Sequence, residues 1–231
     1  MITEDQPVLS IIIPTLNEEA NINATLTNLN KSDITCSFNI IIVDGGSQDA
    51  TVCQAQQQGA QIIKSESGRG KQLAAGGKYA KGTWFLFLHA DTILETGWFR
   101  EVEQFITDVK EPDRAAVFSF KLDEDNFATS ILETIVKWRT HKLALPYGDQ
   151  GLLISNELYH NLEGYAPISI MEDVEIVRRI GRSQLHVFKS HAITSSHKYR
   201  RDGYILRTLR NFLCLTLYFL GFQPHWISKI Y

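Results

Sequence analysis

A histidine and an aspartate, separated by one alanine, end an apolar segment of the chain. They lie in the motif LHADT, as His89 and Asp91. A carboxylate and an imidazole at a strand end can coordinate a divalent cation, which in turn can bridge the oxygens of a diphosphate. An imidazole ligand shifts the preference from Mg²⁺ toward Mn²⁺. The motif predicts that Asp91 binds a metal ion; His89 is either a second ligand or a neutral residue with an internal partner.

Two adjacent carboxylates, Glu172 and Asp173, begin the helix-like segment MEDVEIVRRI. The dipole of a helix favours ionised acids in its first turn. Such a carboxylate acts as a general base if it reaches a hydroxyl proton at hydrogen-bond distance. Capping of the helix is the other interpretation. The loop YGDQG lies upstream, and Asp149 in it either faces a substrate or belongs to a simple turn.

The first apolar segment runs into the polar turn PTLNEE. Its backbone groups and the side chains of Thr15, Asn17 and Glu18, after Pro14, are suited to contact a nucleotide. An ordinary strand-to-helix turn would have the same composition.

Two further segments have residue types that suit nucleotide binding. In VDGGSQDAT, two glycines follow Asp44 and allow close approach of the backbone to a ligand. Asp44 can accept hydrogen bonds from a base or a ribose, or cap the following helix. In GRGK, Arg69 and Lys71 can bind a diphosphate or lie on a solvated face. GRGK is not a P-loop, because Ser65 replaces the required glycine and Gln72 the required Ser/Thr.

These motifs follow short apolar segments that alternate with amphipathic ones. Strands are expected at residues 8–13, 40–43 and 84–88, and helices at 17–30, 47–59 (with Ser47 as N-cap) and 70–81. Such alternation predicts βαβ units and a mostly parallel sheet flanked by helices. Ligands of these sheets bind at the carboxyl ends of the strands, so the motifs are expected to meet at one edge.

The second half of the chain is less regular. Strands are expected at 115–122, 151–154, 185–188 and 192–194, and helices at 126–143, at 171–180 and from about 202 onward. The chain has no internal repeat or low-complexity linker.

Composition excludes several classes of protein. The 231 residues are 44% apolar and 21% charged with a net charge of −3, which excludes a disordered chain and argues against a general nucleic-acid-binding protein. The three cysteines are widely spaced, so neither a disulfide framework nor a zinc site is expected. The acidic residues near the N-terminus are unlike a signal peptide, and we expect a cytoplasmic protein.

The order of the motifs resembles the family 2 glycosyltransferases of the GT-A fold. The likeness consists of PTLNEE, VDGGSQDAT, GRGKQLAAGGKYAKGTWFLFLHADT, GDQ and MEDVEIVRRI, over residues 8–182. It is greatest to a small bacterial subgroup associated with radical-SAM and selenium-related genes, to which the tail segment SSHKYRRDGY is also similar. The resemblance implies a GT-A domain at 1–195, a helical extension at 196–231 packed on it, a nucleotide-diphosphate sugar donor, and transfer with inversion.

The resemblance also implies roles for individual residues. Pro14, Thr15, Asn17 and Glu18 match the first nucleotide loop of the family. Asp44 matches the acid that contacts the base, although the usual second acid of that motif is a glycine here.

For the reacting groups, the resemblance implies a metal site and a catalytic base. Asp91 matches the last acid of the DXD metal motif, whose first acid is replaced by His89. A Mn²⁺ or Mg²⁺ ion is therefore implied as cofactor, with Arg69 or Lys71 helping to neutralise the leaving diphosphate. Asp173 matches the presumed catalytic base, with Glu172 beside it.

The C-terminal segment is basic. From residue 195 to the end, six Lys or Arg face one Asp, a net charge of +5, so residues 1–194 carry −8. The uncharged stretch 211–222 is too short for a bilayer, which needs about 20 residues. If a helix begins near Arg200, then Arg200, Arg207 and Arg210 share a face. This face either lies on an anionic membrane, at the inner membrane face, where family members meet lipid-linked acceptors, or points into water while the helix packs on its own domain.

Two other functions remain open from the sequence. The loss of the first acid at His89 suits a catalytically weak nucleotide-sugar-binding protein. A nucleotidyltransferase on a similar sheet is the third candidate, disfavoured because no glycine-rich triphosphate loop follows the first strand.

Overall fold

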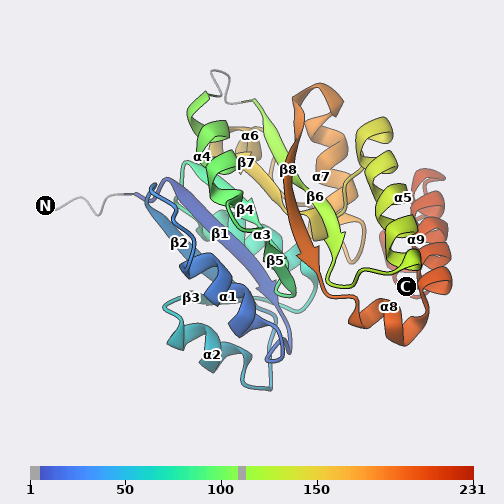
Figure 1. Cartoon of the computed structure of the whole chain (residues 1–231), viewed down its shortest axis with the longest axis horizontal. Helices are drawn as coiled ribbons and strands as arrows, with labels where there is room; N and C mark the ends of the chain where they lie inside the picture. Colours follow the sequence, from blue (N-terminus) through green and yellow to red (C-terminus); the bar gives the residue numbers. More distant parts are fainter. Residues whose placement is uncertain (1–5, 109–112) are drawn as a thin grey trace, which may run out of the picture.

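The computed structural model describes residues 6–108 and 113–231. The first five residues, which include the acids of the N-terminal segment considered above, lie outside this part. One sheet of eight strands, in the order β3-β2-β1-β4-β7-β6-β8-β5, has helices on both faces (Figure 1). The predicted α/β fold, a mostly parallel sheet flanked by helices, is confirmed.

The first half of the sheet is parallel. Strands β1, β2, β3 and β4 pair in parallel, and helices α1, α2 and α3 connect them. The carboxyl ends of the strands therefore meet at one edge, as expected. The bounds are β1 (Leu9–Thr15), α1 (Ile22–Asn30), β2 (Phe38–Asp44), α2 (Thr51–Gln57), β3 (Gln61–Lys64), α3 (Arg69–Tyr79) and β4 (Trp84–Phe87).

The second half is mixed. Strand β7 runs antiparallel between β4 and β6, β8 pairs in parallel with β6, and β5 pairs antiparallel with β8 at the sheet edge. The bounds are β5 (Thr92–Leu94), α4 (Trp98–Asp108), β6 (Ala115–Leu122), α5 (Phe127–Leu143), the 3₁₀ turn η1 (Gly148–Gln150), β7 (Leu152–Ser155), α6 (Asn156–Asn161), α7 (Glu172–Ile180), the 3₁₀ turn η2 (Arg182–Gln184), β8 (Leu185–Thr194), α8 (His197–Asp202), α9 (Tyr204–Phe219) and α10 (Pro224–Ile227).

Two sequence expectations are wrong in detail. The two strands expected at 185–188 and 192–194 are one strand, β8, whose ladder with β6 shifts register between Val117 and Ser119. Ser47 does not cap a helix: α2 begins at Thr51, and Ser47 Oγ instead accepts the backbone N–H of Asn17 at 3.0 Å. The helix expected from about residue 202 is α9, which is separated from the short helix α8 by Gly203, whose φ is 81°.

Apolar residues cover both faces of the sheet. One cluster joins β1, β4 and β6 to α1 and α4, with Leu26, Trp98 and Phe118 at its centre. The other lies against α3 and α7, around Phe85 and Tyr159. Helix α3 approaches the sheet closely at Gly76, where a Cβ would collide with the methyl groups of Ile12 and Val43.

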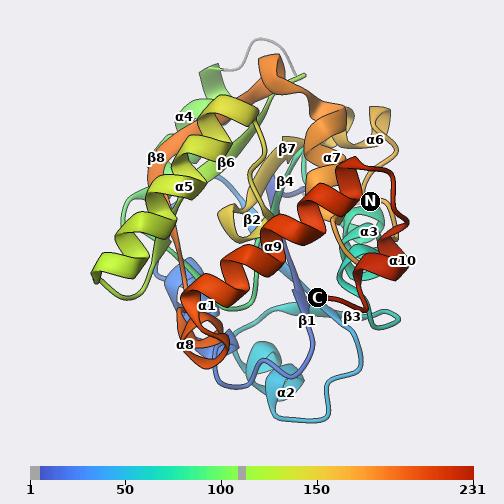
Figure 2. The same cartoon turned by 90° about the vertical axis from the view of Figure 1, so that its right-hand side faces the viewer.

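The C-terminal helices pack beside α7. Cys214 and Leu215 of α9 and Ile227 of α10 form a third apolar cluster with Met171 and Val174. Helix α9 lies beside α5 on the face turned to the viewer in Figure 2. Within the described ranges, no helix is both long and apolar enough to cross a membrane.

The close approach at Gly76 predicts the effect of a single methyl group. Gly76→Ala should destabilise the fold by about 1–3 kcal/mol, because the sheet must shift to admit the methyl group, although alanine ordinarily favours a helix over glycine. Urea unfolding measures the change, with Lys78→Ala on the exposed side of α3 as control. A variant as stable as the wild type would show that the helix moves away freely.

Candidate functional site

A cavity of about 520 Å³ opens at the carboxyl ends of β1 and β4. Its wall combines the β1 turn, the start of α3, the end of β4 and the C-terminal segment. The lining residues are Pro14, Thr15, Leu16, Glu18, Ser67, Gly68, Arg69, Gln72, His89, Ala90, Asp91, Arg201, Asp202, Arg207, Arg210 and Tyr231.

Arg69 lies between the two acidic motifs of the site. Its Nε pairs with Glu172 Oε1 at 2.5 Å, and its Nη1 lies 3.3 Å from His89 Nε2. Partial burial disfavours the charge on Arg69, but the carboxylates of Glu172 and Asp173 outweigh this cost and raise its pKa. Glu172 is 1% exposed, and burial raises its pKa while Arg69 opposes the rise. The adjacent acids Glu172 and Asp173 therefore have different partners. Glu172 forms an ion pair with Arg69, whereas Asp173 accepts backbone N–H groups.

Asp173 lies beside His89, with Gly148 between them. Its Oδ2 accepts the N–H of Gly148 at 2.6 Å, and its Oδ1 accepts its neighbour Val174 N–H at 2.8 Å. A Cβ on Gly148 would stand 2.7 Å from His89 Nε2 and 3.3 Å from Asp173 Oδ2, so only glycine fits there without displacement. Asp173 lines a small cavity of about 50 Å³ that shares Arg69 and Tyr231 with the larger one.

The side chains of the cavity wall decide what kind of metal site His89 and Asp91 could form. His89 and Asp91 both line the cavity, as does Asp202, which is paired with arginines. The described residues contain no group of three or more His, Cys, Asp or Glu arranged for a metal ion. His89 and Asp91 suit a hard cation that takes two ligands from the protein and completes its coordination shell with phosphate and water. They do not suit a site whose ligands all come from the protein.

Three of the four residues predicted in the first nucleotide loop line the cavity. They are Pro14, Thr15 and Glu18. Asn17 is absent from the wall and has a left-handed backbone, with φ 54°. Its Oδ1 accepts the N–H of Gln48 at 2.9 Å, which ties this turn to the loop after β2.

Asp44 and Lys71 also lie outside the cavity wall. The carboxylate of Asp44 is buried and accepts the N–H groups of Gly46 and Ser47 at 3.1 and 3.0 Å, so it closes its own loop. Lys71 Nζ pairs with Glu66 at 2.6 Å. Contact of either residue with a donor stays a prediction.

The sequence did not point to several residues of the wall. Gln72 is buried and its Nε2 donates to the carbonyls of Thr15 and Val43, both at 2.8 Å, joining β1 to β2. Arg207 and Arg210 face the cavity, where a membrane or water face had been expected. The spacing of Arg207 and Arg210 in the sequence does indicate that they lie on one helix face. Arg200, which was expected on the same face, instead pairs with Glu124 at 2.9 Å.

Asp149 is a further ionisable group of the site region. Its Oδ1 is buried with no hydrogen-bond partner in the described structure. Burial raises its pKa to about 6; the guanidinium of Arg139 opposes the shift, and the carboxylates of Asp173 and Asp91 add to it.

The sheet, with a cavity at the carboxyl ends of its parallel strands, has the GT-A fold of solved glycosyltransferases. The mannosyltransferase PcManGT from Pyrobaculum calidifontis, solved with GDP-Man and Mn²⁺, aligns at TM-score 0.59 and 16% identity over 81% of this chain and 56% of that one. S. aureus TarS 1-349 in complex with UDP aligns at TM-score 0.63 and 17% identity, over 96% and 69%. At such identities the likeness concerns the fold.

The chain belongs to glycosyl transferase family 2, whose profile matches residues 10–160. A PGL/p-HBAD biosynthesis glycosyltransferase from Mycobacterium tuberculosis is 35% identical over 116 residues, 46% of this chain and 44% of that protein. A dolichyl-phosphate beta-glucosyltransferase from Dictyostelium discoideum is 27% identical over 157 residues, 59% and 48%. The chain thus spans less than half the length of these relatives. The family resemblance is confirmed; the bacterial subgroup stays a prediction.

The raised pKa of Asp149 predicts a pH-dependent stability. Its ordinary pKa is 3.8 and its folded value about 6, so between these values the folded chain holds a proton that the unfolded chain has released. Stability from this group is complete below the lower value and is lost as the pH rises through the higher one. Asp149→Asn should therefore stabilise the protein more at pH 7.5 than at pH 4.5, by urea unfolding.

Asp33→Asn is the matched control, because Asp33 is exposed. A difference between Asp149→Asn and wild type that is equal at both pH values would contradict the prediction.

Proposed function

We propose that this chain transfers a sugar from a nucleotide-diphosphate sugar to an acceptor hydroxyl, with inversion at the anomeric carbon. One observation carries the proposal: Asp173 lies beside His89 and near the cavity that Pro14, Thr15 and Asp91 line. Asp173 thus lies next to the cavity in which the donor would bind, as the proposed base must. Membership of glycosyl transferase family 2 supports the same reaction.

Asp173 is the proposed catalytic base. Backbone N–H groups hold both of its oxygens, while the remaining lone pairs of an ionised carboxylate can still accept a proton. As the acceptor oxygen attacks the anomeric carbon, Asp173 takes the hydroxyl proton. The attack comes from the side opposite the diphosphate, and a single displacement inverts that carbon.

Arg69, which lines the cavity, would help to neutralise the leaving diphosphate. Asp91 and His89 would hold a divalent cation, Mn²⁺ or Mg²⁺, which supplies Lewis-acid stabilisation of the departing phosphate oxygens. The mannosyltransferase PcManGT was solved with GDP-Man and Mn²⁺, which supports this pairing of donor and metal.

A catalytically weak nucleotide-sugar-binding protein is the second candidate. Two observations favour it: the described residues contain no group of three or more side chains arranged for a metal ion, and both oxygens of Asp173 are already hydrogen-bonded. Activity of the Asp173 variant separates the two functions.

The donor test uses UDP-glucose, UDP-GlcNAc, GDP-mannose and dTDP-rhamnose with Mn²⁺, and measures release of the nucleoside diphosphate. At least one donor should be hydrolysed slowly without an acceptor. Asp173→Asn should lower that rate by about 100-fold or more, since a general base contributes on this order, while the donor Kd stays within about twofold of the wild type.

Asp33→Asn serves again as control and should keep the wild-type rate. Donor binding with equal turnover in wild type and Asp173→Asn would favour the weak binding protein. If the wild type neither binds nor turns over any of the four donors, both candidate functions are overturned.

We also propose that the acceptor is presented at a lipid surface. The side of α9 turned away from the cavity exposes Leu206, Leu209 and Phe212, the last 67% exposed. Two further exposed aromatics, Phe219 at the end of α9 and Trp226 on α10, have cations over their rings: Arg178 at 5.0 Å and Lys229 at 4.5 Å. Exposed apolar side chains bordered by cations suit an anionic bilayer surface. The relative named dolichyl-phosphate beta-glucosyltransferase also supports an acceptor at a lipid surface, because its name refers to a lipid phosphate.

Vesicle sedimentation tests this surface. The wild type should sediment with phosphatidylglycerol vesicles, and Leu209→Ser/Phe212→Ser should lose most of that binding, because each removed apolar side chain contributes about 1.5–3 kcal/mol of burial. Tyr79→Ser, at an exposed aromatic on α3, is the control. Equal sedimentation of the double variant and the control would exclude α9 as the contact.

A further inference from the structure

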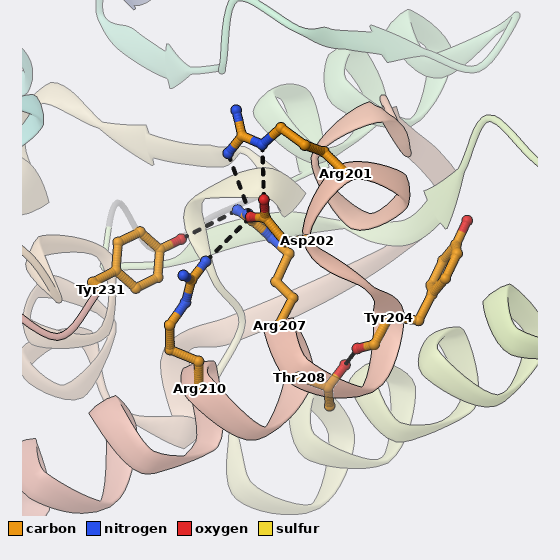
Figure 3. Close-up of polar contacts among 7 residues, drawn as sticks. All are labelled: Arg201, Asp202, Tyr204, Arg207, Thr208, Arg210 and Tyr231. Carbon is orange, nitrogen blue, oxygen red and sulfur yellow. Dashed lines mark hydrogen bonds and ion pairs between the residues drawn. The ribbon is translucent and has the colours of Figure 1, made fainter.

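Three arginines of the C-terminal segment surround one carboxylate in the cavity wall. Asp202 pairs with Arg201 Nε at 2.7 Å, Arg207 Nη1 at 2.8 Å and Arg210 Nη2 at 3.3 Å. Figure 3 shows the guanidinium groups converging on this side chain from α8 and α9. The bend at Gly203 lets the two helices direct their arginines to the same point.

This cluster carries an excess of positive charge. Three guanidinium groups against one carboxylate leave a net charge of +2. The side chains of Arg207 and Arg210 are only 12% and 32% exposed, so water screens this excess poorly. A partly buried cluster with surplus positive charge is suited to bind an anion.

The arginines are held in place before any ligand arrives. Arg207 lies over the ring of Tyr199 at 5.2 Å, and Arg210 lies over that of Tyr231 at 5.4 Å. The Nε atoms of Arg207 and Arg210 are buried and have no hydrogen-bond partner in the described structure. Asp202 stays ionised, because the hydrogen bond from Arg201 lowers its pKa to about 2.

We propose that Arg207 and Arg210 bind the β-phosphate of the donor and stabilise its charge as the sugar leaves; this rests on the function proposed above. Guanidinium groups suit phosphate oxygens because their N–H groups form paired, charge-assisted hydrogen bonds. The C-terminal segment then completes the donor site opposite Asp91 and Arg69.

A phosphate on the acceptor has the same chemistry. The position of the arginines favours the donor, because they line one cavity with Thr15, Asp91 and Arg69, where the nucleotide loop lies. Binding of nucleotides without acceptor distinguishes the two sources.

The experiment titrates UDP, GDP and their monophosphates into wild type, Arg210→Ala, Arg207→Ala and Arg200→Ala by calorimetry with Mn²⁺. Arg200 is the matched control, since it lies on the same helix pair but bonds Glu124 outside the cavity. For the preferred base, Arg210→Ala and Arg207→Ala should each raise the diphosphate Kd by about tenfold or more. The monophosphate Kd should change less than about twofold, and Arg200→Ala should match the wild type.

Arg210→Lys covers the case in which an alanine variant fails to fold. It keeps the charge but loses the planar pair of donors, and should weaken diphosphate binding by about threefold to tenfold. Diphosphate binding that is equal in Arg210→Ala, Arg210→Lys and Arg200→Ala would overturn the inference and leave the proposed function intact. Failure of the wild type to bind either diphosphate would overturn both.

Discussion

The ion pair between Arg69 and Glu172 holds the two halves of the site together. Glu172 is almost fully buried, and its charge is tolerated because Arg69 lies at 2.5 Å. Removal of one partner from such a pair costs about 3–5 kcal/mol, since the other charge stays buried. The pair joins the start of α3 to the start of α7, so it sets the position of the next residue, Asp173. This contact between distant segments therefore helps to position Asp173, the proposed base, beside the cavity.

Glycine makes this contact sterically feasible. Gly70 brings the first turn of α3 against the backbone carbonyls of Ala166 and Ile168, at distances that a Cβ would not allow. Gly148 does the same between His89 and Asp173. Charged side chains can meet at short distance here because the backbones between them carry no side-chain volume. The electrostatics of the site thus depend on local backbone sterics as much as on the choice of acids and bases.

Much of the fold follows from the sequence, whereas the orientation of side chains follows only in part. Strands β1, β2 and β4 are continuous apolar runs, and their polar carboxyl ends predict that Thr15, His89 and Asp91 meet. Strand β3 has four residues and both ends are exposed, so it lacks the continuous apolar run that identifies β4, a strand of the same length. Asp44 and Lys71 have the right residue types for a ligand but find closer partners in Gly46, Ser47 and Glu66. The sequence pattern alone does not show whether such a side chain bonds a ligand or a neighbouring protein group.

The C-terminal helix shows the clearest limit of pattern analysis. Periodicity establishes that Arg207 and Arg210 share a face, but it does not say whether that face meets solvent or protein. In an ordinary surface helix the polar face is outward, because the protein interior is apolar. Here the neighbouring interior is a polar cavity that holds Asp202, so the arginines turn inward and Leu206, Leu209 and Phe212 turn outward. A helix with this orientation has a charged side toward the proposed donor site and an apolar side toward the proposed lipid surface. If both proposals hold, α9 joins the two substrates physically: any shift of α9 on the bilayer would also move the arginines that contact the diphosphate.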